Sequence, residues 1–359
     1  MVSNLSNCDE NSILLFEYFT ANGINDMSII SEATGMIKEL ADDLKHLDIY
    51  LIVSKKFKNL FEDLDVKIIF INEPLIHWLE KNACKFKKSI FIADEEDEHL
   101  FNITKILEDN HLKLYCSNSE SIITCTNKYL THELLKNLVN QPLTYKIKID
   151  SYSNFKNEIL SIYNEFNKYK DTKLIIKPIN GVDCERVSLI SKKDDLINFN
   201  NIYPKGTTVL IQKYIEGYSC SVSLLTDGDH AIPLSLNKQN ILFGKKDISY
   251  NGGELPFNHP LKNQAFKLAT DAVETVKGLK GFVGVDLILG EEVTFLEINS
   301  RFTTPYVGLK KLVNFNIGET IINLLDNKIN IQKLKENILL NGKVKFTKEE
   351  NELKIEEFN

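Results

Sequence analysis

Three oxygen-bearing side chains near residue 290 are spaced in a way that suits the binding of a divalent cation. Asp286 stands in one short apolar run, Glu297 and Asn299 stand in the next, and Gly290-Glu291-Glu292 separates the two runs. This arrangement predicts a β-hairpin. Because side chains alternate along a strand, Glu297 and Asn299 point to the same face. Two carboxylates and an amide oxygen form an oxygen-only ligand set, which favours Mg²⁺.

An arginine follows this hairpin. Arg301 stands two positions after Asn299 and shares its face if the strand continues, where its guanidinium could hold a carboxylate or phosphate through two hydrogen bonds. Only Arg186 and Arg301 are arginines among the 43 basic residues, which suggests that the planar group is needed. A hairpin with its polar residues turned to water, and two arginines retained by chance, are the alternatives. No role is assigned to Arg186.

Two further segments could bind a nucleotide. Lys177 ends the apolar run 174–176, and a phosphate would give this lysine a partner, with a Gly-containing turn beyond Pro178 that lets backbone amides approach. The run 209–211 ends in a polar hinge whose backbone could bind the adenine edge, with Ile215 against the ring. The alternatives are a lysine that extends from a strand end to water and an ordinary turn.

The elements that must position these residues alternate along the first third of the chain. Strands are expected at 13–19, 48–53, 67–71 and 89–93, and helices at 31–47, 73–82 and 95–108. Such alternation predicts βαβ units and a parallel sheet. Ligands bind beyond the carboxyl ends of parallel strands. The loop with Glu17 and Gly23 is therefore a candidate substrate loop, with a plain turn as the alternative.

The remainder of the chain also mixes strands and helices. Strands are expected at 145–149, 173–177, 187–191, 208–214, 219–225, 282–289 and 293–298, and helices at 127–139, 155–169 and 261–279. The polar stretch 237–258 carries no expected element. The charge-rich tail from Gly342 is expected to be a loose edge or disordered.

Composition excludes several classes of protein. A chain of 359 residues favours two or three domains. The net charge of −7 argues against nucleic acid or anionic membrane as the main partner. No segment reaches the roughly 18 apolar residues of a membrane helix, and residues 1–12 lack a signal-peptide pattern, so a cytoplasmic protein is expected. The six cysteines form no C-x-x-C pair, and no G-x-G-x-x-G supports a dinucleotide site.

Taken in order, these motifs resemble the ATP-grasp superfamily of carboxylate–amine ligases over residues 127–312. The resemblance rests on Lys128, Lys177-Pro178, Gln212-Lys213-Tyr214-Ile215-Glu216-Gly217, Asp286 and Glu297-Ile298-Asn299-Ser300-Arg301. It implies an α/β protein in which two α+β subdomains grip ATP after a parallel α/β domain. The implied parts are 1–118 (N-terminal domain), 119–211 (linker helix and lid), 212–341 (subdomain with the metal site) and 342–359 (charged tail).

The resemblance also implies a role for each motif. Lys128 and Lys177 would hold phosphates, Asp286, Glu297 and Asn299 would bind one or two Mg²⁺ or Mn²⁺ ions, and Arg301 with Lys177 would serve catalysis. Adenine and ribose would be bound by the hinge, Gln212, Lys213, Tyr214, Ile215 and Glu216. The chain departs from the usual pattern in two places: Gln212 stands where many members carry Glu, and Ser219 stands where some carry a ribose-binding Glu.

Shorter motifs along the whole chain are similar to the tyramine–L-glutamate ligases of methanofuran biosynthesis in methanogenic archaea. They include Phe16-Glu17-Tyr18, Tyr250-Asn251-Gly252-Gly253-Glu254 and Thr303-Thr304-Pro305-Tyr306. The similarity implies that L-glutamate and tyramine are joined through an acyl-phosphate at the expense of ATP, giving γ-glutamyltyramine, ADP and phosphate. Candidate substrate-pocket residues are Glu17, Gly23, Ser221, Asn237, Gln239, Gly252, Gly253 and Thr303.

Rival functions stay open at this point. Another amino acid or dipeptide ligase shares every broad motif, and only the substrate loops separate it. A biotin-type carboxylase or a phosphoribosylamine ligase would need contacts that the sequence does not display. A non-catalytic nucleotide-binding regulatory module is the alternative outside enzymes. A homo-oligomer is compatible with the sequence.

Overall fold

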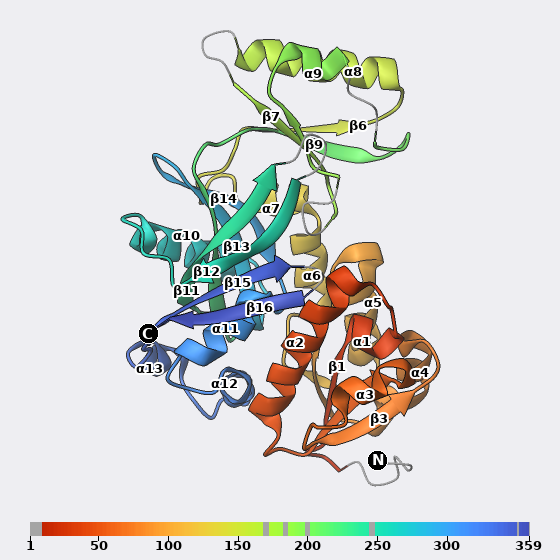
Figure 1. Ribbon diagram of the computed structural model, residues 1–359. Helices are drawn as coiled ribbons and strands as arrows, with labels where there is room; N and C mark the ends of the chain where they lie inside the picture. Colours follow the sequence, from red (N-terminus) through yellow and green to blue (C-terminus); the bar gives the residue numbers. More distant parts are fainter. Residues whose placement is uncertain are drawn as a thin grey trace.

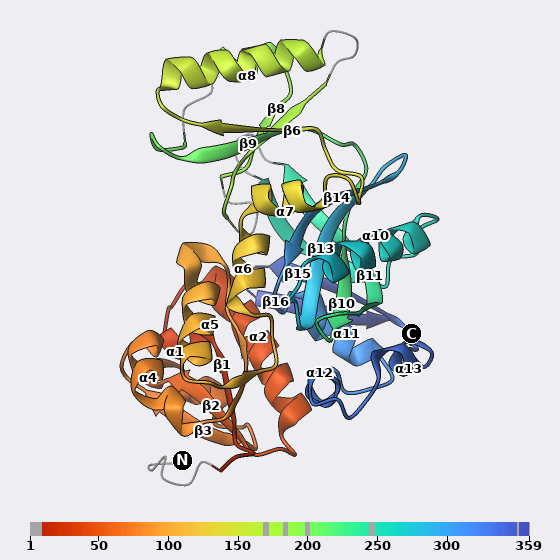
Figure 2. The same ribbon diagram turned by 180° about the vertical axis from the view of Figure 1, so that it is seen from behind.

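The computed structural model describes residues 9–167, 172–181, 186–197, 202–243, 248–349 and 352–358. Three β-sheets organise this part of the chain (Figure 1). The same arrangement from behind shows α6 (Ser119–Thr126) and α7 (Lys128–Leu135) leading from the N-terminal sheet to the lid sheet (Figure 2). No described helix is both long and apolar enough to cross a membrane.

The N-terminal sheet is parallel throughout, with strand order β3-β2-β1-β4-β5. Its strands are β1 (Ile13–Glu17), β2 (Ile49–Ser54), β3 (Lys67–Ile71), β4 (Lys88–Ile92) and β5 (Lys113–Leu114). The connecting helices are α1 (Tyr18–Asn22), α2 (Met27–Leu44), α3 (Lys58–Phe61), α4 (Leu75–Asn82) and α5 (His99–Asp109), with 3₁₀ turns at Lys55–Phe57, Ala83–Lys85 and Glu96–Glu98. Every residue of β1 and β2 is buried, as continuous apolar runs in a covered sheet must be.

Several expected boundaries in this domain are wrong, and the helix expected at 31–47 spans Met27–Leu44. The first strand ends at Glu17 rather than residue 19, because the Glu17 carboxylate accepts hydrogen bonds from the backbone N–H groups of Phe19 and Thr20 and so starts a helix. The helix expected from residue 95 begins at His99, after a 3₁₀ turn.

The lid sheet is antiparallel, with order β6-β9-β7-β8. It contains β6 (Thr144–Lys148), β7 (Leu174–Pro178), β8 (Ser188–Ile190) and β9 (Thr208–Lys213). Helix α8 (Tyr152–Phe166) covers its outer face, and α9 (Lys193–Ile197) lies beside that helix (Figure 1). The end of the helix expected at 155–169 lies partly outside the described residues.

The C-terminal sheet has order β14-β13-β10-β11-β12-β15-β16, and neighbouring strands are antiparallel. Its strands are β10 (Tyr218–Thr226), β11 (Ala231–Phe243), β12 (Ile248–Leu255), β13 (Gly281–Leu289), β14 (Val293–Asn299), β15 (Lys343–Glu349) and β16 (Glu352–Phe358). One face packs against α10 (Lys262–Thr275), and the other packs against α11 (Pro305–Leu312) and α12 (Ile317–Leu325), with α13 (Ile331–Lys335) beyond.

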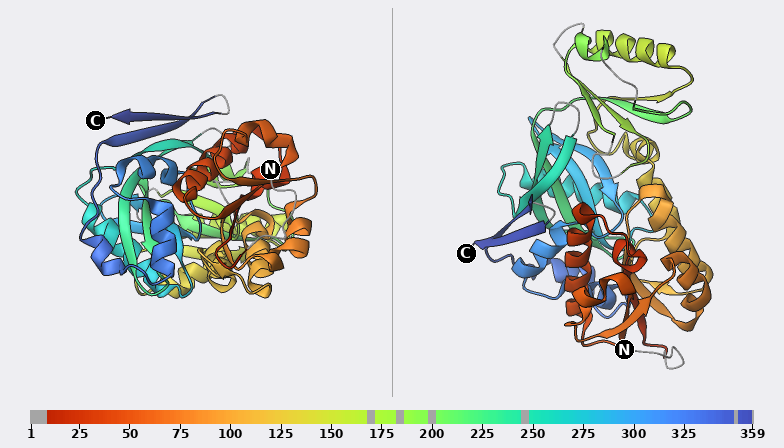
Figure 3. Two further views of the ribbon diagram at one scale, coloured as in Figure 1. Left: turned by 90° about the horizontal axis from the view of Figure 1, so that it is seen from below. Right: turned by 45° about the vertical axis from the view of Figure 1, so that its right-hand side comes forward.

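The structure corrects two expectations here. The polar stretch 237–258 supplies the end of β11 and all of β12. The tail from Gly342 forms the hairpin β15–β16 at the edge of the sheet (Figure 3). The Leu353 N–H of this hairpin donates to Ser31 of α2 at 2.9 Å. Gly252 allows this addition, because a Cβ there would lie 2.1 Å from the Phe346 carbonyl oxygen of β15.

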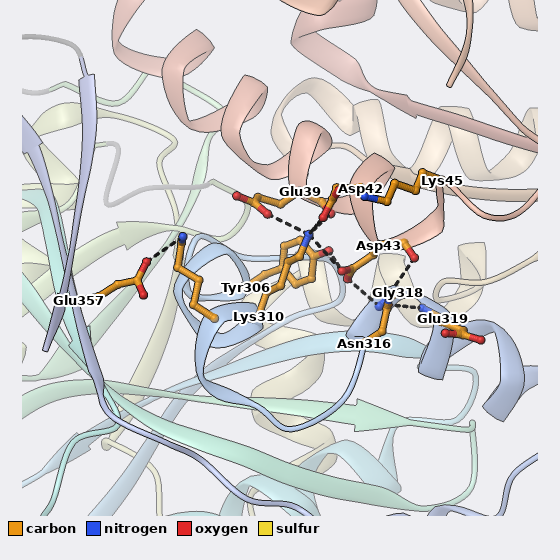
Figure 4. Close-up of polar contacts among 11 residues, drawn as sticks. Glu39, Asp42, Asp43, Lys45, Tyr306, Lys310, Asn316, Gly318, Glu319 and Glu357 are labelled. Atoms are coloured by element: carbon orange, nitrogen blue, oxygen red, sulfur yellow. Dashed lines mark hydrogen bonds and ion pairs between the residues drawn. The ribbon is translucent and has the colours of Figure 1, made fainter. Parts of the chain in front are cut away.

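The N-terminal domain and the C-terminal subdomain share a core and a partly buried ionic junction. Lys310 of α11 lies 2.9 Å from both Glu39 and Asp42 and 3.1 Å from Asp43, all on α2 (Figure 4). Asp43 also accepts hydrogen bonds from the Tyr306 hydroxyl at 2.8 Å and from a backbone N–H at the start of α12. This junction holds α11 against α2, and with it the segment that follows the hairpin β13–β14.

Candidate active site

A row of polar residues crosses four adjacent strands of the C-terminal sheet. The strand register aligns Asn237 of β11 with Ser221 of β10, Ser221 with Asp286 of β13, and Asp286 with Glu297 of β14. Residues aligned across neighbouring strands point to the same face, so the four side chains form one polar strip. Asn299 stands two residues beyond Glu297 on that same face.

Asp286 is held at the centre of this strip. Gln239 donates a hydrogen bond to its Oδ1 at 3.0 Å, and Asn299 donates to its Oδ2 at 3.2 Å. Burial, together with the nearby Glu297 charge, raises the pKa of Asp286 to about 7. Two half-buried carboxylates at paired positions repel each other, and a bound cation would relieve this repulsion.

The donor set therefore fits a divalent cation. Asp286, Glu297 and Asn299 offer the carboxylate and amide oxygens that Mg²⁺ and Mn²⁺ accept. Within the described ranges, no group of three or more His, Cys, Asp or Glu side chains gathers into another metal site. A site with two carboxylates and one amide leaves room for phosphate oxygens as the remaining ligands.

Two lysines converge on Glu297 from outside this sheet. Lys128, the first residue of α7, lies 3.3 Å from the Glu297 carboxylate, and Lys177 of lid strand β7 lies 4.0 Å from it. Burial acts to raise the pKa of Glu297, but the two lysines outweigh it, so this pKa lies below its ordinary value. Lys128 also donates to the Gly181 carbonyl at 2.6 Å, in the turn after β7. The two ammonium groups concentrate positive charge beside the carboxylates, as binding of phosphates requires.

The hinge lies where β9 leaves the lid sheet. Gln212 is buried and donates to the Thr144 hydroxyl at 2.9 Å, so its side chain is engaged within the lid. Backbone N–H groups of Lys213 and Tyr214 bond to neighbouring carbonyls. Ile215 is half-buried, whereas the Glu216 side chain is 81 % exposed and lies 3.5 Å from Lys173. The backbone groups of the hinge that make none of these bonds, together with Ile215, are the parts of the hinge that could contact a planar base.

Arg301 links this site to the N-terminal domain. Its Nε donates to Oε2 of Glu95 at 2.6 Å, and its Nη1 donates to the Phe302 carbonyl at 3.2 Å. The Glu95 side chain is buried, and the Arg301 side chain is half-buried. Glu95 was missed in the sequence because it stands among five consecutive acidic residues, 94–98, and its partner is 206 residues away. Arg186 has a left-handed backbone, with φ of 54°, and its carbonyl accepts a hydrogen bond from the Tyr203 hydroxyl.

The expected substrate residues fall into two groups. Ser221 and Asn237 belong to the polar strip, where Asn237 donates to Ser221 at 3.1 Å. Gln239 and Thr303 lie next to the strip: Gln239 donates to Asp286, and Thr303 packs over Gly284, the partner of Asn299. The others have structural tasks, namely helix capping for Glu17 and Gly23, and close strand packing for Gly252 and Gly253.

Comparison with known proteins shows the family to which this chain belongs. The ATP-grasp domain model matches residues 125–305. The tyramine–L-glutamate ligase of Methanocaldococcus fervens is 33 % identical over 83 % of this chain and 89 % of its own length. That of Methanocaldococcus jannaschii is 31 % identical over 88 % of this chain and 90 % of its own length.

Solved structures agree in fold. An ATP-grasp superfamily protein from Archaeoglobus fulgidus has a TM-score of 0.69 at 24 % identity and covers 97 % of this chain and 99 % of its own. The L-amino acid ligase from Bacillus licheniformis has a TM-score of 0.63 at 14 % identity, covering 94 % of this chain and 80 % of its own. The family model and the two relatives show that this chain is an ATP-grasp enzyme, an ATP-dependent carbon–nitrogen ligase. Within that class, the chain belongs to the tyramine–L-glutamate ligase family.

Proposed function

We propose that this enzyme joins the γ-carboxylate of L-glutamate to the amine of tyramine, forming γ-glutamyltyramine, ADP and phosphate, as a step of methanofuran biosynthesis. Two relatives named for this reaction, each matched over most of its length, support the choice of substrates. The observation that carries the chemistry is the pairing of Asp286 with Glu297 beside two lysines.

In this proposal each part of the site has one task. Lys128 and Lys177 neutralise the phosphates of ATP, and the hinge, from Gln212 to Glu216, binds the adenosine. A divalent cation held by Asp286, Glu297 and Asn299 would supply further positive charge next to the phosphates. Charge neutralisation and positioning are the main catalytic terms in phosphoryl transfer.

Arg301 acts on the carboxylate side of the reaction. Its guanidinium stabilises the negative charge of the acyl-phosphate and of the tetrahedral intermediate that forms when the amine attacks. The lid sheet, 144–213, covers the nucleotide and excludes water, which would otherwise hydrolyse the acyl-phosphate. The residues that would contact glutamate lie in the polar strip or next to it: Ser221, Asn237, Gln239 and Thr303.

A substrate screen tests the proposal. The enzyme is mixed with Mg²⁺, ATP, L-glutamate and one of several amines, including tyramine, phenethylamine, tyrosine and alanine, and both ADP release and product mass are measured. We expect turnover with tyramine to exceed that with every other amine. Turnover with an amino acid but not with tyramine would leave an ATP-grasp ligase of different specificity.

A further inference from the structure

Glu95 has a free oxygen beside the catalytic arginine. Its Oε2 accepts the hydrogen bond from Arg301, and its side chain is only 7 % exposed. Across the described part of the chain, no hydrogen bond reaches its other oxygen, Oε1. A buried carboxylate that uses one oxygen to hold an arginine can present the other to a cationic ligand.

The position of Glu95 in the fold is one where ligands bind. The chain runs outward from β1 through β2 to β3 and then returns to β4 on the other side of β1, so the strand order reverses between β1 and β4. Such a reversal opens a crevice at the carboxyl ends of the two strands. Glu95 stands three residues beyond the end of β4, and Tyr18 follows the end of β1.

The walls of this crevice suit an aromatic amine. The rings of Tyr18 and His99 are stacked, with centroids 4.0 Å apart, and Asp94 lies 3.0 Å from Nδ1 of His99. Tyr18 and His99 are both half-buried, so part of each remains accessible at this edge. Aromatic faces bind both aryl rings and ammonium groups.

The other carboxylates near the site are already engaged. Asp286 and Glu297 belong to the polar strip, and Glu297 also pairs with Lys128 and Lys177. The Glu17 carboxylate caps α1, and Asp94 pairs with His99. An alkylamine resembles the lysine side chain, with a pKa of about 10.4, so it arrives protonated and must lose protons before and after it attacks. A base beside Arg301 is therefore required, and Glu95 is placed there.

We propose, building on the ligase function above, that Oε1 of Glu95 receives the amine substrate and acts as its general base. The bound ammonium first gives one proton to solvent. The neutral nitrogen then bonds to the carbonyl carbon, the carbon–oxygen bond to phosphate breaks, and phosphate leaves with that electron pair. The surplus proton on nitrogen passes to Oε1, while Oε2 keeps Arg301 in place.

Two nucleophiles distinguish a general-base role of Glu95 from a purely structural one. Hydroxylamine is neutral near pH 7.5 and traps the acyl-phosphate as a hydroxamate without a base, whereas tyramine needs one. Glu95→Gln keeps the size of the side chain and an oxygen that can accept from Arg301. We expect this variant to retain hydroxamate formation within about threefold, while tyramine-dependent amide formation falls about 10²-fold.

Matched variants complete the experiment. Glu98→Gln, an exposed change in the same loop, should leave the ratio of the two rates at its wild-type value. If Glu95→Gln fails to fold, as judged by circular dichroism, Glu95→Asp is read instead, with a selective loss of about tenfold expected. An unchanged ratio in the folded variant overturns the proposal. If the wild type does not use tyramine, the substrate assignment fails, and the same ratio is measured with the amine that it accepts.

Discussion

Individual side chains at this site are placed by strand register and by charge. Side-chain alternation on a hairpin puts Glu297 and Asn299 on one face, and that much follows from the sequence alone. The pairing of Asp286 with Glu297, and of Asp286 with Ser221, depends on the register of three strands, which the sequence does not specify. The contact between Arg301 and Glu95 is even harder to predict from the sequence, because it joins two domains.

Glu297 is expected to be essential for turnover. Glu297→Gln removes a metal ligand and the negative partner of Lys128 and Lys177, so kcat/KM should fall by about 10²-fold or more. ADP release with glutamate and amine present measures the effect. Glu292→Gln, an exposed change in the turn of the same hairpin, is the control and should keep wild-type activity. Full activity of the Glu297 variant would refute the assignment of the metal site.

Glu17 should make stability depend on pH. Burial raises the pKa of Glu17 to about 7, although hydrogen bonds from Thr20 and Phe19 oppose the shift. Since this folded-state pKa lies above the unfolded value of about 4.3, the contribution is present below pH 4 and is lost as the pH rises through 7. Between pH 5 and pH 8, the wild type should lose about 2 kcal/mol that Glu17→Gln does not lose.

Urea unfolding of both proteins at the two pH values provides the measurement. The quantity of interest is the change in their stability difference, because other carboxylates contribute equally to both. Parallel pH profiles would show that Glu17 is not held at a raised pKa.

At the scale of elements, prediction succeeds for buried apolar runs and fails where polar strands or glycines take part. Strands β2, β3, β4, β7 and β13 lie close to their expected ranges, since each is a short run of apolar residues. β12 was missed because it contains Asn251, Gly252 and Gly253, which disfavour strands when considered alone. Its pairing with β11 and β15 overrides that preference.

The attachment of the C-terminal hairpin should depend on Gly252. Gly252 and Gly206 both have φ of 92°, but a Cβ on Gly252 would meet the Phe346 carbonyl, whereas a Cβ on Gly206 meets nothing within 4 Å. Gly206→Ala should therefore lower the free energy of unfolding by about 1 kcal/mol, from backbone strain alone. Gly252→Ala should lower it by about 3 kcal/mol, from strain and the clash together.

Thermal or urea unfolding of the two variants tests this difference. Hydrogen exchange in β15 and β16 should also rise selectively in Gly252→Ala, because the pairing of β12 with β15 is disturbed. Equal losses in the two variants would contradict the packing argument.

The whole molecule works as a unit because its N-terminal domain helps to build the site. The sequence predicts the parallel sheet and the ATP-grasp fold, and both are present. It does not reveal that Lys310 would bind three carboxylates of α2, or that Glu95 would hold Arg301, since residues hundreds of positions apart meet only in the folded chain. These contacts hold α2 and the loop after β4 against the C-terminal subdomain.

Lys310 should contribute strongly to the stability of the contact between the N-terminal domain and the C-terminal subdomain. Lys310→Met leaves the buried Asp43 carboxylate without its ammonium partner, so the free energy of unfolding should fall by about 3 kcal/mol. Lys311→Met is a matched control on the same helix: Lys311 pairs with the exposed Glu357, so this substitution should cost less than about 1 kcal/mol. Urea denaturation of both variants is the measurement, and comparable losses would contradict a special role for the junction (Figure 4).

Transfer of oxygen from glutamate to phosphate tests the central claim most directly. L-Glutamate labelled with ¹⁸O in its γ-carboxylate is supplied with ATP, Mg²⁺ and tyramine, and the released phosphate is analysed by mass spectrometry. If the carboxylate attacks the γ-phosphate, each phosphate formed with γ-glutamyltyramine carries one ¹⁸O atom. Product formed together with unlabelled phosphate would contradict the acyl-phosphate route and the roles assigned to the polar strip and to Arg301.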